Sequence, residues 1–335
     1  MIYLAVIFLL FGGMLIYTKL ANKYLIFDKP NERSSHVIPT IRGGGIVFLL
    51  SILFTGFMYH PVYWVPILGA CLIGIISFLD DNMEVSKGIR FVFHLFSVTL
   101  LFIFLDIFSK ESVWAIIALY ILVAGIINAY NFMDGINGIT GLYSLVVLGA
   151  LQYVNLYQHS FIEANLIWFP ILACLVFLFY NFRAKAKIFA GDVGSITMAF
   201  WVIFLIFDLI LDTNNWVYIL FLTVYGVDTV LTIAHRLLLK QNIFEAHRLH
   251  FYQILANEQK VPHRVVAVIY AVLQALIIVL VLFTNLSFLS ILLLSSLPLV
   301  AFYILMKPRF MANPKPAKII SVQNSPNKQP ALVRQ

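Results

Sequence analysis

The sequence predicts an all-α polytopic membrane protein with about 11 transmembrane helices, and three observations support this fold class. Hydrophobic residues make up 62% of the 335 residues and charged residues only 11%, whereas soluble domains carry about 25% charged residues. Long apolar runs follow one another along the chain, without the period-two alternation of a membrane β-barrel. Basic residues occupy alternate breaks between these runs. The composition excludes a soluble enzyme, a secreted disulfide scaffold and a disordered protein.

A transmembrane helix needs roughly 17–25 mainly apolar residues, and eleven segments of the chain meet this requirement. They are residues 2–20, 43–59, 64–80, 90–108, 112–130, 137–154, 163–181, 192–211, 215–234, 264–283 and 286–306. The first segment lacks a basic start and a small-residue cleavage site. We therefore interpret it as a retained helix and not as a signal peptide.

The distribution of basic residues predicts the orientation in the membrane. With this layout, 21 of the 22 Lys and Arg residues lie on one face and Lys110 alone on the other. Because basic loops favour the cytoplasm, the N-terminus is expected outside and the C-terminus inside, in a cell inner (cytoplasmic) membrane. Residues 1–306 form the membrane domain, with a cytoplasmic loop at 235–263, and residues 307–335 a disordered cytoplasmic tail. The net charge of +7 suits anionic lipid and phosphates, not nucleic acid.

Two adjacent carboxylates, Asp80 and Asp81, end the third predicted helix. Adjacent carboxylates repel each other unless a cation or a proton intervenes, and acids at a helix C-terminus oppose its dipole. A divalent cation or a protonated nucleophile would offset both effects. The alternative is the solvated start of an ordinary loop.

Carboxamides and an acid gather where the fifth and sixth predicted helices meet. Asn128, Asn131 and Asp134 follow one another at three-residue spacing, so they can present one polar face to a ligand. The glycines that follow allow a tight turn. An ordinary polar turn is the alternative.

The eighth predicted helix opens with small residues around Asp192, in residues 189–195. A helix N-terminus favours anions such as phosphate, but Asp192 fits a simple N-cap equally well. In the last large loop, His247 and His250 are three residues apart and would share one face of a helix, where they could bind phosphate, bind metal or be solvated. Asp228 lies near the inner end of the ninth helix and could pair with Arg236 or with a cation of the loop.

Together these groups predict one site at the inner membrane surface. Ten of the fifteen acids lie on the inner face. Magnesium is usually held by one or two carboxylates and by substrate phosphates, and such a site suits phosphoryl transfer. A polytopic transporter or lipid flippase, the alternative of another class, would place its acids near the midplane of the bilayer.

Five motifs in this order resemble those of the polyprenyl-phosphate N-acetylhexosamine-1-phosphate transferases, glycosyltransferase family 4. This superfamily includes the phospho-N-acetylmuramoyl-pentapeptide transferase of peptidoglycan synthesis. The motifs are residues 28–36 with 39–44, 80–81, 128–135, 191–195 and 247–253. The resemblance implies a Mg²⁺-dependent enzyme, with Mn²⁺ as an alternative metal. It would transfer N-acetylhexosamine-1-phosphate from a UDP-sugar to polyprenyl (undecaprenyl) phosphate in the membrane, releasing UMP.

The resemblance also implies roles for particular residues. Asp192 is the implied main metal ligand, and Asp80 or Asp81 is the implied base toward the lipid phosphate or a further metal ligand. Asn128, Asn131 and Asp134 are implied contacts to the nucleotide-sugar and its diphosphate, and Asp134 also counts among the catalytic carboxylates. Phe189 is the implied uracil stack, and His247 and His250 are implied to bind the nucleotide-sugar. Charge and place alone assign Lys87, Arg90 and Arg42 to phosphates.

Departures from the family pattern narrow the expectation. Asn137 stands where many relatives have aspartate, which weakens a catalytic role there. The segment 247–250 reads HRLH and lacks a denser histidine run, so the pentapeptide transferase is the less favoured alternative. The O-antigen or capsule-initiating branch, a first step of lipopolysaccharide or related glycan synthesis, fits better. The sequence leaves open the sugar (GlcNAc, GalNAc, QuiNAc or FucNAc) and the oligomeric state, a homodimer included.

Overall fold

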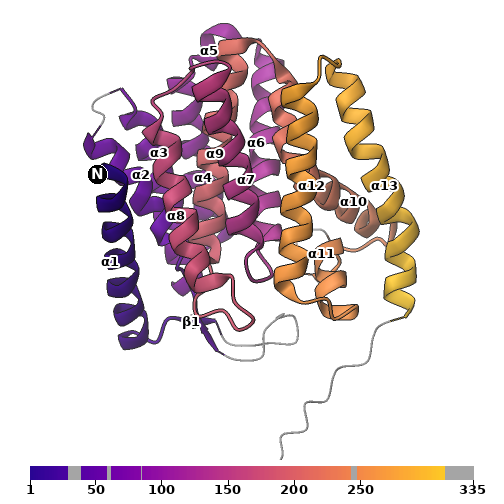
Figure 1. The fold of residues 1–335 in the computed structure, drawn as a ribbon, viewed down its shortest axis with the longest axis horizontal. Helices are drawn as coiled ribbons and strands as arrows, with labels where there is room; N and C mark the ends of the chain where they lie inside the picture. Colours follow the sequence, from indigo (N-terminus) through magenta and orange to yellow (C-terminus); the bar gives the residue numbers. More distant parts are fainter. Residues whose placement is uncertain (29–38, 59–61, 84, 243–246, 314–335) are drawn as a thin grey trace, which may run out of the picture.

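The computed structural model describes residues 1–28, 39–58, 62–83, 85–242 and 247–313, which form a bundle of upright helices (Figure 1). The α-helices are α1 (Ile2–Lys23), α2 (Ile46–Met58), α3 (Trp64–Met83), α4 (Lys87–Phe104), α5 (Ile107–Lys110), α6 (Val113–Met133), α7 (Ile139–Tyr157), α8 (Asn165–Asn181), α9 (Gly191–Thr213), α10 (Thr223–Leu238), α11 (Phe251–Gln253), α12 (His263–Phe283) and α13 (Phe288–Ala312). A 3₁₀-helix (Trp216–Leu222) precedes α10, and a π-helix (Ile254–Glu258) follows α11. The strands β1 (Phe27–Asp28) and β2 (Thr40–Ile41) pair antiparallel.

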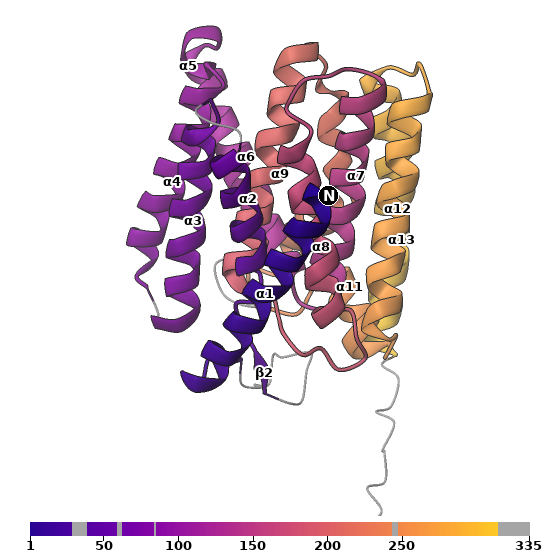
Figure 2. The ribbon, with the colours of Figure 1, turned by 60° about the vertical axis from the view of Figure 1, so that its left-hand side comes forward.

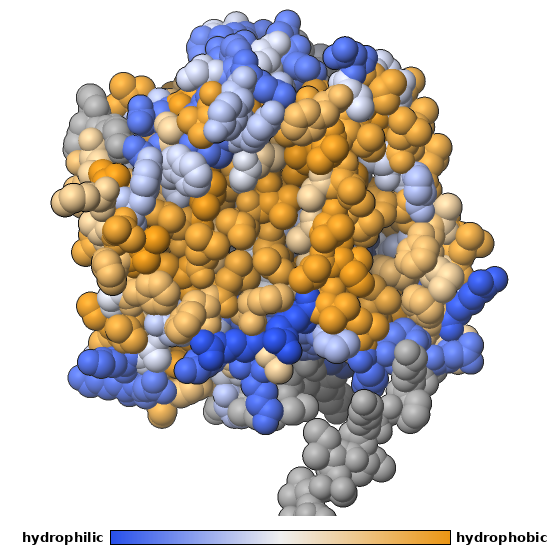
Figure 3. Space-filling model, in the orientation of Figure 1, coloured by the Kyte–Doolittle hydropathy of each residue, from blue (hydrophilic) through white to orange (hydrophobic). Residues whose placement is uncertain are grey.

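The helices confirm the predicted class, an all-α polytopic membrane protein. Within the described part of the chain, nine helical segments are long and apolar enough to cross a membrane, and α2 and α8 are shorter apolar helices. Each of the eleven predicted segments corresponds to one of these; the ninth combines the 3₁₀-helix with α10. The surface shows a broad apolar band between two hydrophilic ends (Figure 3).

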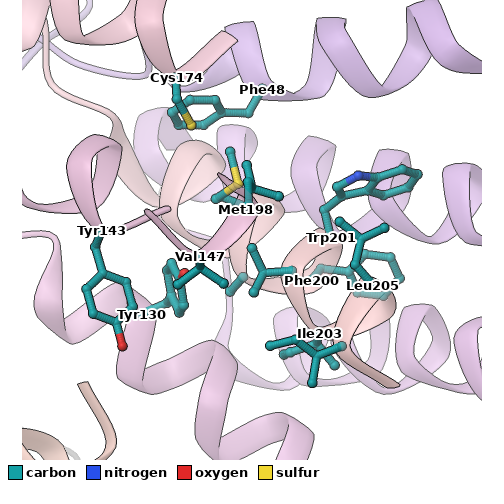
Figure 4. Close-up of a cluster of buried hydrophobic side chains, with 14 of the residues drawn as sticks. Phe48, Tyr130, Tyr143, Val147, Cys174, Met198, Phe200, Trp201, Ile203 and Leu205 are labelled. Carbon is teal, nitrogen blue, oxygen red and sulfur yellow. The ribbon is translucent and has the colours of Figure 1, made fainter. Parts of the chain in front are cut away.

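The long helix α9 lies at the centre of the bundle and is buried along nearly its whole length. It stands between the α3–α4 side and the α12–α13 side (Figure 2). Its Met198 lies among Phe48 of α2, Val147 of α7 and Cys174 of α8 (Figure 4). The Trp201 ring nitrogen donates to the Leu166 carbonyl of α8 (2.9 Å), and the Phe200 ring faces Gly69 of α3. Such close packing is what holds helices together in a membrane, because lipid and side chains are equally apolar. The rigid centre fixes the first turn of α9, where Asp192 lies.

Two boundaries differ from the sequence prediction. Asp106 has a left-handed backbone (φ 56°), so α4 ends at Phe104 and the predicted segment 90–108 is interrupted before α5. The helix α13 continues to Ala312, so residues 307–312 are helical where a tail was predicted. Residues 29–36 of the first motif and 314–335 of the predicted tail lie outside the described residues.

The two ends of the bundle carry different elements. The strands β1 and β2 and the helix α11 lie at one end, here called the β1/β2 end, and α5 lies at the opposite, α5 end (Figure 1). Because neighbouring helices alternate in direction, the ends of α3 and α6 meet the starts of α4 and α9 at the β1/β2 end. The predicted motifs therefore gather at this end.

Candidate active site

Close backbone packing brings the glycine-rich turn before α2 against the start of α9. The amides of Gly44 and Gly45 donate to the carbonyls of Phe189 (2.8 Å) and Ala190 (2.9 Å). A Cβ on Gly45 would lie 2.1 Å from the Cα of Gly194, so only glycine permits this approach. The packing places Arg42 beside Asp192, although they are far apart in the sequence.

Three aspartates and two arginines form a cluster at the ends of α3, α4 and α9, called the Asp–Arg cluster below; its members are Arg42, Asp80, Asp81, Arg90 and Asp192. A nitrogen of Arg42 lies 2.6 Å from Asp81 and 3.6 Å from Asp192. Arg90 pairs with Asp80 and lies 4.0 Å from Asp192. The Asp192 carboxylate, 20% exposed, therefore sits between two guanidinium groups.

Asp81 holds the first turn of α9 in place. Its two carboxylate oxygens accept hydrogen bonds from the amides of Asp192 (3.2 Å) and Val193 (3.3 Å), and its side chain is 1% exposed. An anion does sit at this helix N-terminus, but it is the protein's own carboxylate. Asp192 is not the N-cap, a position held by Ala190. Asp81 is thereby saturated with partners.

The pKa of Arg42 reflects the excess of carboxylates in the Asp–Arg cluster. Burial alone would lower the pKa of Arg42, but the carboxylates of Asp81 and Asp192 outweigh it and raise that pKa above its ordinary value. With all three carboxylates ionised, the two guanidinium groups would leave one negative charge in the cluster. A further cation would therefore be attracted to this site.

Asn131, in the last turn of α6, and Asp134, in the α6–α7 connection (residues 134–138), face the same region. Asn131 accepts a hydrogen bond from the Ser195 hydroxyl of α9 (3.1 Å). Asp134 accepts one from the Thr140 hydroxyl (2.5 Å), and burial raises the pKa of Asp134 to about 7. Asn128, by contrast, is exposed, and its amide donates to the Ala124 carbonyl of its own helix. The structure thus brings Asn131 next to α9 but leaves Asn128 on the surface of α6.

The histidine segment packs against this connection. The rings of His247 and His250 stack 5.0 Å apart, and both lie near the ring of Phe132, at 6.3 and 6.0 Å. The two histidines precede α11, so they do not share a helix face as predicted. Burial, with the nearby His250, lowers the pKa of His247 to about 4, so this imidazole is neutral at pH 7. Asp228 pairs with His250 of the loop and not with Arg236.

A basic cavity of about 650 Å³ has Ile41, the residue before Arg42, and Phe189, three residues before Asp192, in its wall together with Asn137. Its basic lining residues are Arg183, Lys185, Lys187, Lys260, His263 and Arg264. The sequence does not predict that Lys260 and Arg264 lie near the segment 183–187, because the start of α12 approaches that segment only in the folded chain. The 183–187 basic run was the available signal. The cavity has the size and charge for a phosphorylated ligand.

The expected metal ligands, Asp192 and Asp80, both face the same nitrogen of Arg90. Across the described ranges, no three His, Cys, Asp or Glu side chains form a group that could hold a metal ion. Magnesium commonly needs only one or two carboxylates when phosphates supply other ligands. The residues therefore fit a cation that Asp192 and Asp80 share with a bound phosphate, and do not form a complete protein cage. Lys87 is exposed and pairs with none of the described carboxylates.

Comparisons with known proteins show what the chain as a whole is similar to. The family model for glycosyl transferase family 4 matches residues 63–210. A probable undecaprenyl-phosphate N-acetylglucosaminyl 1-phosphate transferase of Bacillus subtilis is 27% identical, over 72% of each chain. A phospho-N-acetylmuramoyl-pentapeptide-transferase of Petrotoga mobilis is 30% identical, over 46% of this chain and 56% of that protein.

A third relative, an undecaprenyl-phosphate alpha-N-acetylglucosaminyl 1-phosphate transferase of Escherichia coli, is 28% identical over 57% of each chain. The match spans little more than half the length of the Petrotoga and Escherichia relatives. The matched segment 63–210 contains the whole run from Asp80 to Asp192. Over residues 63–210 the chain is similar to glycosyl transferase family 4.

Proposed function

We propose that this protein transfers N-acetylhexosamine-1-phosphate from a UDP-sugar to polyprenyl phosphate. The products are a polyprenyl-diphospho-sugar and UMP. The observation that carries the proposal is the Asp–Arg cluster, because it joins buried charges of opposite sign at helix ends, next to a basic cavity. The names of the relatives from Bacillus and Escherichia support the same reaction. A membrane enzyme needs such a site at the bilayer surface, where a lipid phosphate and a water-soluble donor can meet.

The basic cavity is the proposed donor site. Its lysine and arginine side chains offset the charge of the diphosphate, and Phe189 offers an aromatic face for the uracil ring. Asn137 in the same wall has its amide committed to the Arg183 carbonyl (2.9 Å) and so shapes the cavity. The donor's diphosphate would then extend toward Asp192, three residues from Phe189.

The chemistry is an in-line substitution at phosphorus. An oxygen of the lipid phosphate forms a bond to the β-phosphorus of the donor, the bond to the bridging oxygen breaks, and UMP leaves with the electron pair. Arg42 and Arg90 are suited to neutralise the anionic reactants. Asp192 and Asp80 would hold Mg²⁺, which supplies charge neutralisation of the phosphates when bound.

Asp134 is the proposed acceptor for a proton on the lipid phosphate. A base works best when its pKa lies near the working pH, and the pKa of Asp134 is about 7. Asp81 is less suited, because an arginine and two backbone amides already occupy its carboxylate. Asp80, paired with Arg90, serves better beside the metal.

The β1/β2 end is the proposed cytoplasmic end, in the inner membrane of a bacterium. The ends of helices rich in Lys and Arg lie here, whereas Lys110 lies in α5 at the opposite end. Short basic loops stay in the cytoplasm, where UDP-sugars are made. Within the family, we assign the chain to the branch that starts O-antigen, capsule or related glycans.

The test is UMP release by the full-length protein in detergent. Each reaction contains one UDP-N-acetylhexosamine or UDP-N-acetylmuramoyl-pentapeptide, with Mg²⁺ and undecaprenyl phosphate. Release that requires both lipid and metal, for one of the hexosamine donors, supports the proposal and identifies the sugar. Release only from the pentapeptide donor would replace the proposed branch by the peptidoglycan one. No release from any donor by folded protein would refute the transferase.

A further inference from the structure

The buried carboxylate of Asp228, in α10, is the meeting point of five hydrogen bonds. It accepts from the amides of Phe251 (2.9 Å) and Tyr252 (3.3 Å) and from the Tyr270 hydroxyl of α12 (2.6 Å). The imidazole of His250 (3.3 Å) and the Thr232 hydroxyl (3.2 Å) complete the set. Asp228 is 4% exposed. A buried carboxylate with this many donors is held firmly and in turn holds its donors.

These donors tie the histidine segment to the bundle. His250, Phe251 and Tyr252 are consecutive residues, and all three contact the same carboxylate. Because Nδ1 of His250 faces Asp228, Nε2 faces away from it, and this buried nitrogen has no hydrogen-bond partner in the described part of the chain. With a proton on Nδ1, Nε2 has a free lone pair. The carboxylate therefore fixes both the place of the ring and the direction of its open nitrogen.

The histidine segment in turn contacts the end of α6 and the α6–α7 connection. The Tyr252 hydroxyl donates to the Phe132 carbonyl (2.8 Å), and the ring of Phe132 lies against the rings of His247 and His250. Phe132 stands between Asn131, which is bonded to α9, and Asp134. A contact chain thus runs from Asp228 through the histidine segment to the connection beside the Asp–Arg cluster.

A second chain reaches Asp228 from α13. The ammonium group of Lys307, 3% exposed, donates to the Tyr303 hydroxyl, which lies 2.8 Å from the Thr232 hydroxyl. The Thr232 hydroxyl in turn bonds Asp228. Residues of α13 therefore also support the Asp228 carboxylate. Asp228 thus connects several helices and does more than stabilise its own helix, α10.

We infer that Asp228 is a positioning residue: it holds His250 and the segment 247–252 against the α6–α7 connection, in the arrangement that the sugar-nucleotide donor requires. The inference rests on the proposed function, because it names the donor as the ligand whose binding depends on the arrangement. Asp228 itself touches no reacting group. Its loss should weaken donor binding more than it slows the bound donor's reaction.

The test uses Asp228→Asn in the full-length protein, since asparagine keeps the volume but loses the charge and one acceptor. Hydrogen–deuterium exchange should quicken about tenfold or more in residues 247–258 and stay unchanged in α9, because a local unit opens more often once a charged bond is lost. In the UMP assay, KM for the donor should rise about tenfold while kcat falls less than threefold. Asp208→Asn, at the α5 end of α9, is the matched control and should change neither quantity.

Tyr270→Phe is the second variant, should Asp228→Asn fail to fold. It removes one hydrogen bond and leaves the carboxylate, so a smaller change of the same pattern is expected. Unchanged exchange in 247–258, or exchange that quickens equally in every helix, would overturn the positioning role. Local quickening with an unchanged donor KM would overturn the link to the donor. Absence of UMP release from the wild-type protein would refute the proposed function, whereas the exchange data would still decide whether Asp228 orders the segment.

Discussion

The aspartates of the Asp–Arg cluster at the β1/β2 end are largely buried and are joined to arginines across several helices, whereas the His159–Asp212 pair at the α5 end is exposed. Asp81 is 1% exposed and bonded to Arg42, which also faces Asp192. At the α5 end, His159 and Asp212 form one pair at 2.6 Å, and their side chains are 44% and 52% exposed.

This difference separates two uses of charge in one membrane protein. Exposed pairs stabilise a protein by about 0–1 kcal/mol and need no further explanation. Buried charges at a helix end cost far more and persist where pairing or function compensates. The contrast therefore identifies the β1/β2 end as the place where chemistry is expected, and each substitution below compares the two ends or tests one of them.

The largest effect is expected for Asp192→Asn. This change removes the carboxylate that lies between Arg42 and Arg90, and we expect UMP release to fall at least about a hundredfold, as when an electrostatic active-site group is removed. Asp212→Asn, in the last turn of the same helix α9, should keep activity within about twofold. Normal turnover by folded Asp192→Asn would remove Asp192 from the site.

Arg42→Gln should affect stability as well as activity. It leaves the buried Asp81 without its charged partner, and we expect a loss of about 1–3 kcal/mol in the free energy of unfolding, the cost of an unsatisfied buried polar group. Lys110→Gln at the α5 end removes an exposed contact to Asp106 at 4.0 Å and a long hydrogen bond to the Leu105 carbonyl (3.4 Å), so less than about 0.5 kcal/mol is expected. Thermal unfolding in detergent compares the two. Equal losses would show that burial at the β1/β2 end carries no extra stability.

The sequence predicts the spans better than their ends. Apolar length alone identifies the eleven long apolar segments, because a spanning helix must be apolar over a set length. It does not predict the left-handed Asp106 that ends α4, nor the 3₁₀ start of the ninth span, since both depend on local packing. Charged residues and a proline at positions 307–309 interrupt the apolar run of α13, and the contact of Lys307 with Tyr303 is seen only in the fold.

The same limit applies to the site. The order of the motifs predicts that Asp80, Asp81 and Asp192 converge, because all of them end or begin helices on one face. It does not predict which basic side chain reaches them: Arg42 and Arg90 do, and Lys87 does not. The position of a residue within a helical turn determines whether its side chain points toward the aspartates. The sequence also does not predict that His250 contacts Asp228, because the loop that contains His250 has no periodic pattern from which its position could be inferred.

Asp134 should give the β1/β2 end a pH dependence of stability. In the unfolded chain its carboxyl loses its proton near pH 3.8, but in the folded protein burial raises the pKa to about 7. Between these values the folded state binds the extra proton, so this contribution to stability is complete below about pH 4 and is lost as the pH rises through 7. Asp134→Asn should remove that loss in thermal unfolding series. A variant with the wild-type profile would contradict the raised pKa.

Thr140→Val sharpens the same test. The Thr140 hydroxyl donates to the Asp134 carboxylate and so holds its pKa lower than burial alone would. Without that bond, the loss of stability should move to higher pH, while Asp134 itself remains. A shift to lower pH would mean that the hydroxyl does not favour the ionised carboxylate.

The smallest effect is expected for Lys87→Ala. Lys87 and Arg90 both lie in the first turn of α4, but Lys87 is exposed, whereas Arg90 contacts Asp80 and lies 4.0 Å from Asp192. Surface substitutions usually change stability by no more than about 0.5 kcal/mol, so the variant should retain activity within about twofold. Arg90→Ala should lower UMP release much more, because it unpairs Asp80. If Lys87→Ala lowered turnover as strongly as Arg90→Ala, the exposure of Lys87 in the free protein would not predict its contribution to the reaction. Lys87 would then have to reach the phosphates once the donor binds.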